Sequence, residues 1–423
     1  MTTQVVIMNT GGIALATDSA VSMKGKKVSD AADKLFPLSE RHNIGVMTYG
    51  VNAMFHIPWE ALIKVYNRKL DVRGFDTVKE YMEDFLKFLH QNEFYEFMDE
   101  ENEERHINHT LSSNMTRLHH ELSQKHKRLY RELGKEKQPN EVQEMYMEQA
   151  ELYLSKRRRE LTDKEYPKGF NSNDYVQLVG KYAGNVSELL EQKFERHLFK
   201  DEWMDAITEV MIQSIIKDFS DKFSGIIFAG YGKKEIYPTV YLLIIDGKVN
   251  HKNKYFIKKK KINHQIHGII FPLAKRDRVK GFLDGIHADI EDFIGTIFKN
   301  QLAMLTDTWA EQVKDHLHDE ADWEEIQGKM SAASMQVYDT YKKELFYYQR
   351  EKFIDPMLEV VESSSTIELA HLAESLLQIS TLKRDFSAYS EMVGGPIDVA
   401  TITKGDGFSW LRKKEGGKTY SGI

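Results

Sequence analysis

The sequence contains no cysteine and few prolines, and each absence excludes a class of site or structure. Without a thiol the chain forms no disulfide, no thiolate metal centre and no cysteine nucleophile. Only 8 prolines occur in 423 residues, well under the average of about 5%, so long uninterrupted helices are expected. A Walker A motif and a dinucleotide-binding fingerprint are also absent, and the paired histidines lack the third ligand of a strong metal motif. We therefore expect no cofactor and no metal.

The balance of charge and hydropathy argues against two kinds of partner. The chain has 58 Lys and Arg residues against 65 Asp and Glu residues, a formal charge of −7, whereas a nucleic-acid binder carries a basic excess. No apolar run approaches the roughly 20 residues that span a bilayer. The amino-terminal segment lacks the basic and apolar regions of an export signal. The sequence therefore predicts a soluble, cytoplasmic protein that binds neither nucleic acid nor membrane.

Segments typical of β-strands at both ends of the sequence enclose a long helical middle. Short apolar, β-branched runs indicate strands near the amino terminus, and two final strands are expected over residues 397–403 and 408–411. Strands at both ends with helices between them favour one sheet domain of the α+β class. We assign residues 1–74 and 216–423 to this domain and residues 75–215 to a large all-helical insertion.

The insertion carries the pattern of two packed helices. Leu111, Leu118 and Leu122 recur at helical spacing, residues 134–140 break the pattern, and apolar residues resume it after Val142. This arrangement predicts an antiparallel helical hairpin at about 108–162. A second helical stretch is expected over residues 275–355.

Thr2 becomes a candidate nucleophile once Met1 is removed, which is the usual outcome when the second residue is small. Its hydroxyl would then lie beside the chain's own α-amine, whose ordinary pKa is about 7.7–8.0, and the neutral amine can accept the hydroxyl proton. Asp18 follows Thr2 by 16 residues and Lys34 follows it by 32. A lysine nearby would favour the neutral amine, and an aspartate paired with that lysine would orient it. Taken singly, such residues are more often an ordinary small second residue, a strand-end carboxylate and a surface lysine.

The two spacings together, with the run Ala16-Thr17-Asp18-Ser19-Ala20, resemble the mature amino terminus of proteasome β-subunits and of the HslV peptidase. The similarity continues, in the family's order, through later blocks at residues 47–53, 228–247 and 365–399. This resemblance to the N-terminal-nucleophile (Ntn) hydrolases implies a four-layer αββα sandwich that carries the helical insertion. It also implies a threonine protease that cleaves peptides or unfolded proteins, assembles as a homo-oligomeric ring and works with an ATP-dependent unfoldase.

The same resemblance implies the catalytic roles. Thr2 would be the nucleophile with its amine as the general base. Lys34 would tune that base, and Asp18 would hold Lys34. Asp385 corresponds to the family's acid that supports the threonine.

Two parts of the site depart from the family's pattern. Eight residues separate Asp385 from the following Gly-Gly pair, so that Ser387 and Ser390 compete for the family's supporting serine. The backbone N–H that would bind the oxyanion lies in the turn at Tyr49 and Gly50, where the family has two glycines. A backbone donor survives this change, but the cleft is altered.

The resemblance also places five side chains beside the substrate residue that precedes the scissile bond. All are apolar, which predicts cleavage after hydrophobic residues, although the same side chains would fill a sheet core equally well. They are Val21, Ala32, Phe36, Met47 and Val51.

Two other functions are compatible with the sequence. The same nucleophile would serve a non-proteolytic amidase or acylase that acts on a small molecule. An inactive scaffold or assembly subunit of a proteasome-like complex would keep the fold without the chemistry. Retention of Met1 would indicate this last case, because an acylated amine is not a base. The insertion would line an entrance, gate it or bind a partner.

Overall fold

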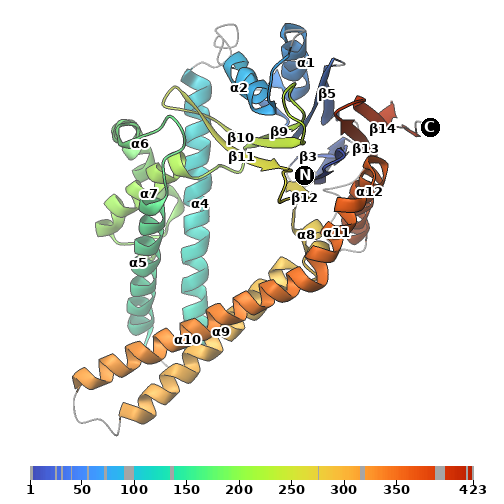
Figure 1. The fold of residues 1–423 in the computed structure, drawn as a ribbon. Helices are drawn as coiled ribbons and strands as arrows, with labels where there is room; N and C mark the ends of the chain where they lie inside the picture. Colours follow the sequence, from blue (N-terminus) through green and yellow to red (C-terminus); the bar gives the residue numbers. More distant parts are fainter. Residues whose placement is uncertain are drawn as a thin grey trace. The chain divides into compact units, whose positions relative to one another are not determined.

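The computed structural model shows a mixed α and β protein with antiparallel sheets (Figure 1). It describes residues 3–23, 26–29, 32–39, 41–54, 57–70, 74–89, 100–133, 138–274, 276–314, 320–385, 396–415 and 418–421. The chain forms two compact units. The first unit holds Met1–Met47, Ala229–Thr239 and Lys260–Ile423, and the second unit holds Thr48–Phe228 and Val240–Lys259. This mixed architecture agrees with the α+β class predicted from the sequence.

A six-stranded sheet lies entirely in the first unit, with the order β12-β1-β2-β13-β14-β15. The apolar runs Val5–Ile7 and Ile13–Ala16, joined across Asn9-Thr10-Gly11-Gly12, predict a hairpin, and β1 and β2 form it. The Asn9 side chain accepts the Gly11 and Gly12 N–H groups in its turn. The prediction of two final strands was incomplete, because β15 follows them. This strand is short and polar, so it lacks the apolar alternation by which strands are recognised. The strands are β1 (Thr3–Asn9), β2 (Ile13–Asp18), β12 (Gly268–Ala274), β13 (Ile397–Thr403), β14 (Gly407–Glu415) and β15 (Lys418–Ser421).

The two faces of this sheet are covered differently. Helices α8 (Arg276–Leu283), α11 (Asp355–Ser363) and α12 (Thr366–Asp385) bury apolar side chains against one face, where they share a core with β1, β2 and β13. On the other face, Gly45 of β6 (His42–Gly50) approaches Leu15 and Ile402 so closely that a Cβ there would lie 2.7 and 3.0 Å from their side chains. The first unit therefore has a helix layer, a sheet and a further strand layer.

The helical stretch expected over residues 275–355 is interrupted at residues 284–287, between α8 and the long helix that follows it. Helix α9 (Ala288–Lys314) packs on α10 (Glu320–Gln349), where the Phe298 ring lies 4.9 Å from that of Tyr341. A π-helical turn, Arg350–Ile354, leads from α10 to α11. One stripe of α9 leaves large apolar side chains exposed at helical spacing: Ile290, Phe293, Ile294, Ile297, Met304, Leu305 and Trp309.

The second unit is built around packed helices. Helices α4 and α5 follow one another in the chain and lie side by side (Figure 1), where the sequence predicts a hairpin. They share a large apolar core with α6 and α7. The helices of this unit are α1 (Trp59–Lys69), α2 (Val78–Leu89), α4 (Glu100–Leu133), α5 (Pro139–Asp163), α6 (Ser172–Lys193) and α7 (Met204–Lys217), with 3₁₀ turns at Arg196–Leu198 and Asp201–Trp203.

A five-stranded sheet has the order β11-β10-β9-β6-β5. Within the second unit, Phe85 of α2 packs on Phe228 of β9, with ring centroids 5.4 Å apart. No helix in the described residues is both long and apolar enough to cross a membrane. The remaining strands are β5 (Leu35–Ser39), β9 (Ser224–Gly230), β10 (Thr239–Val249), β11 (Lys252–Lys261) and the small pairs β3 (Val21–Met23) with β4 (Lys26–Ser29) and β7 (Ala53–Met54) with β8 (Ile57–Pro58).

Candidate active site

The structure brings Lys34 and Asp18 together as a buried ion pair. The Lys34 Nζ lies 3.2 Å from Asp18 Oδ1 and also donates to the Ala20 carbonyl at 2.5 Å. Only 4% of Lys34 and 2% of Asp18 is exposed. Asp18 ends β2, and Gln4 of β1 pairs with Thr17, so the ion pair lies next to the amino-terminal end of β1.

Burial governs the charge of this lysine. Loss of hydration lowers the pKa of the Lys34 ε-amine below its ordinary value, and the Asp18 carboxylate opposes that shift. Two more distant charges act in opposite directions: Lys414 lowers the Lys34 pKa further and Asp398 raises it. The result is an oriented ammonium that loses its proton more readily than a surface lysine does.

A second ion pair, Lys414 with Asp398, adjoins the first, and sequence reasoning missed it. The Lys414 Nζ lies 2.9 Å from Asp398 Oδ2, and both side chains are buried. The Nζ also donates to Ser19 Oγ at 2.9 Å and to the Ala32 carbonyl at 2.6 Å. In the sequence Lys414 looks the same as the exposed Lys413 beside it, so no signal distinguished them.

Ser380 is a further buried polar residue near the amino terminus that the sequence analysis did not identify. It lies on α12 with no exposed surface, and its Oγ is 3.3 Å from Thr3 Oγ1. A signal was present, because Ser380 continues the buried apolar stripe that runs through Leu369, Ala373 and Leu376. A serine in such a stripe is a buried polar group that requires a partner.

Tyr49, Gly50 and Val51, which the sequence assigns to the oxyanion turn and substrate pocket, belong to the second unit. Gly50 ends β6 with a φ of +84°, a conformation that favours glycine. The Val51 N–H donates to the Phe223 carbonyl at 3.1 Å, while the Val51 carbonyl accepts from Ser224 Oγ at 2.7 Å. The turn is therefore held firmly, and 36% of Val51 is exposed.

The Tyr49 ring lies over Gly225, which has room for no side chain. A Cβ on Gly225 would lie 2.7 Å from Tyr49 Cδ1 and would overlap Cε1 and Cζ. We expect Gly225→Ala to destabilise the protein by about 1–3 kcal/mol, the usual cost of overpacking a filled site. In a Tyr49→Gly background the same change should cost less, because the ring is gone. Urea unfolding of the four proteins of this cycle measures the coupling, and equal costs in both backgrounds would contradict the packing described.

The other substrate-binding candidates lie in the first unit. Phe36 and Met47 are buried on the paired strands β5 and β6, where Leu35 faces Met47 and Phe36 faces Val46. Ala32 is half-buried, and its carbonyl accepts from Lys414. Val21 starts β3 opposite Ser29.

Several assigned residues lie outside the described part of the chain. They are Thr2, Ser387 and Ser390. Asp385 is the last residue of α12, and its side chain is likewise outside the description.

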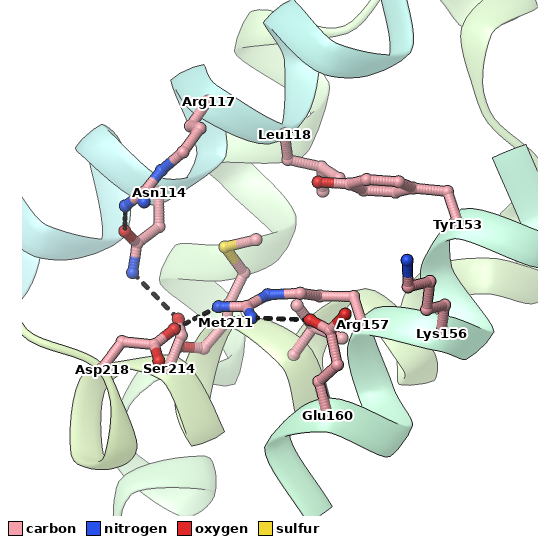
Figure 2. Close-up of a pocket in the computed structure, with 11 residues that line it drawn as sticks. Asn114, Arg117, Leu118, Tyr153, Lys156, Arg157, Glu160, Met211, Ser214 and Asp218 are labelled. Carbon is pink, nitrogen blue, oxygen red and sulfur yellow. Dashed lines mark hydrogen bonds and ion pairs between the residues drawn. The ribbon is translucent and has the colours of Figure 1, made fainter. Parts of the chain in front are cut away.

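The second unit also contains a pocket of about 310 Å³ between α4, α5 and α7 (Figure 2). The acidic side chains that line the pocket form ion pairs with Arg157, which donates to Glu160 at 3.1 Å and pairs with Asp218. Arg117 donates to Asn114 at 2.7 Å. The carboxylates of the pocket are therefore already paired with arginine. None of the residues that line the pocket is a predicted site residue. Within the described ranges, no three His, Asp or Glu side chains gather as metal ligands would.

No protein-family model matches the chain, and no curated protein matches it. The resemblance to proteasome β-subunits therefore rests on the quoted residues alone.

Proposed function

We propose that the chain is a proteasome-like Ntn hydrolase that cleaves amide bonds with Thr2. The observation that carries the proposal is the Lys34–Asp18 ion pair, buried beside the amino-terminal end of β1. A fixed ammonium there would favour the neutral α-amine and stabilise the developing alkoxide. The helix, sheet and strand layers of the first unit agree with the αββα sandwich that the proposal includes.

The proposed reaction begins when the Thr2 α-amine takes the proton of the Thr2 hydroxyl. The Oγ attacks the substrate carbonyl, the C–N bond breaks, and the same proton passes to the leaving amine, which produces an ester on Thr2. Water then attacks the ester while the α-amine accepts the water's proton. The bond between the acyl carbon and Thr2 Oγ breaks, the proton passes from the amine to Oγ, and the carboxylic acid product leaves. By resemblance, a backbone N–H would stabilise the oxyanion in both steps.

The proposal extends to assembly as a homo-oligomeric ring, by resemblance, with an unfoldase as a further partner. The exposed apolar stripe of α9 supports an interface, because a stripe of large apolar side chains is seldom left in water. The helical insertion at residues 75–215 would then line the entrance, gate it or bind a partner such as the unfoldase.

A small-molecule amidase is the second candidate, and one observation favours it. Tyr49 fills the space over Gly225 in the strand turn where proteasome-like peptidases, by resemblance, have two small residues. Activity on a small amide, with none on unfolded protein, would select this candidate.

The intact mass of the purified protein tests the proposal most directly. We expect the measured mass to be that of the chain without Met1. When the reaction with a peptide ester is quenched in acid, we expect a second species, heavier by one acyl group attached to Thr2. A chain that retains Met1 quantitatively would overturn the enzyme proposal and favour the inactive scaffold.

By resemblance, the apolar residues assigned to the substrate pocket in the sequence predict a preference for apolar residues before the scissile bond. A panel of peptides that differ only before the scissile bond should be cleaved after Leu or Phe, because an apolar pocket favours apolar side chains. Mass spectrometry of the products gives the answer. Cleavage after Arg or Asp but not after Leu or Phe would refute this expectation.

A further inference from the structure

Lys414 connects the two segments that carry the Lys34–Asp18 ion pair. Its Nζ donates to Ser19 Oγ at 2.9 Å, directly after Asp18. It also donates to the Ala32 carbonyl at 2.6 Å, two residues before Lys34. One ammonium on β14 therefore holds both segments in place.

The position of Lys414 is itself fixed from two directions. Asp398 of β13 accepts the Lys414 backbone N–H through Oδ1 and the Lys414 Nζ through Oδ2, each at 2.9 Å. Ser19 donates its own proton to the Pro396 carbonyl at 2.7 Å, so its oxygen is oriented to accept from Lys414. Only 6% of Lys414 is exposed. Such a chelated, buried ammonium has little freedom to move.

Three charged groups act on the Lys34 ammonium, and a fourth acts on Lys414. Those that act on Lys34 are Asp18 of β2, Asp398 of β13 and Lys414 of β14. Asp33, in the preceding segment, lies 3.4 Å from the Lys414 Nζ. Lys34 therefore has a second cation in its surroundings as well as its carboxylate partner.

We propose that Lys414 is a positioning residue of the hydrolase site, an inference that rests on the function proposed above: it holds the segments of Asp18 and Lys34 and adds a second positive charge to the surroundings of the Lys34 ammonium. Lys34 acts while it is charged, and it is charged below its pKa. Because Lys414 lowers the Lys34 pKa, activity is lost at a lower pH on the alkaline side than it would be without Lys414. Removal of Lys414 moves this alkaline limit upward.

The test compares Lys414→Met, Lys414→Gln and Lys414→Arg with the control Lys413→Met. Lys413 is the exposed neighbour on the same strand, so its replacement removes an equal charge without touching the site. We expect Lys414→Met and Lys414→Gln to lower kcat for a fluorogenic peptide about 10-fold at neutral pH. In both variants, the pH at which activity falls on the alkaline side should move upward by at least about 0.5 pH unit. Lys414→Arg keeps the positive charge and should leave the alkaline limit of activity where it is in the wild type. Lys413→Met should change neither kcat nor this alkaline limit.

A second measurement does not depend on hydrolysis. In protein labelled with ¹³C at the lysine Cε, the Lys34 signal, assigned by Lys34→Arg, should titrate at higher pH in Lys414→Met and in Lys414→Gln. An unchanged titration in the folded variants, or an equal shift in Lys413→Met, would overturn the inference. If Lys414→Met does not fold, Lys414→Gln decides, because its uncharged side chain keeps a polar amide in the buried site. A shifted titration in a chain without hydrolase activity would show that Lys414 acts on the Lys34 ammonium, but it would remove the proposed function and with it the role of Lys414 in hydrolysis.

Discussion

Thr2→Ala is expected to lower amide hydrolysis by at least about 1000-fold, because the proposed reaction has no nucleophile without the Thr2 hydroxyl. Alanine is also small, so Met1 should still be removed and the free α-amine should still form. The variant therefore isolates the hydroxyl from the processing of the amino terminus. Initial rates on a fluorogenic peptide, with intact mass for each protein, provide the measurement.

The matched control is Thr10→Ala, which removes a hydroxyl from the exposed turn between β1 and β2. It should retain wild-type turnover. Thr2→Ser keeps a hydroxyl beside the amine and should retain measurable activity. Undiminished turnover in Thr2→Ala would count against both the peptidase and the amidase versions of the function.

Local patterns in the sequence predicted those parts of the fold that depend on neighbours in the chain. The hairpin of β1 and β2 has apolar runs on both sides of a turn with Gly11 and Gly12, and the structure confirms it. The stretch over residues 275–355 had the helical period, but the interruption between α8 and α9 was missed because a single glycine, Gly285, is a weak signal. Strand β15 was missed because a short polar strand depends on pairing with β14, which is not a local property.

The candidate site was only partly predictable for the same reason. Asp18 and Lys34 were chosen by spacing that resembles a family, and the structure places them in contact. Lys414 comes from a strand almost 400 residues away in the sequence from Ser19, which it contacts. Side chains that meet only through sheet pairing leave no periodic signal in one sequence. Tyr49 and Gly225 are a similar pair, since a large ring and a missing side chain explain each other only in three dimensions.

Lys254→Met is expected to destabilise the protein by about 3–5 kcal/mol, because it leaves the buried Asp246 carboxylate without its counter-charge. In the second unit, the Lys254 Nζ lies 2.8 Å from Asp246 Oδ2, and 1% of each side chain is exposed. The same ammonium donates to the Ile215 carbonyl at 2.7 Å and to the Asp218 carbonyl. Methionine fills the volume but satisfies none of these acceptors. Urea unfolding measures the loss, and Lys258→Met, an exposed lysine of the same strand, should change stability by less than about 0.5 kcal/mol.

The pH dependence of this loss follows from the direction of the lysine's shift. Burial lowers the pKa of Lys254 below 10.5, with Asp246 opposing the shift. Between the lowered value and 10.5 the unfolded chain binds a proton that the folded chain has released, so this group makes the wild type more stable as pH rises through that window. The variant lacks this contribution. The stability difference between wild type and Lys254→Met should therefore widen from neutral pH to about pH 10, and a difference that narrows over this range would show that Lys254 keeps its proton more firmly when folded.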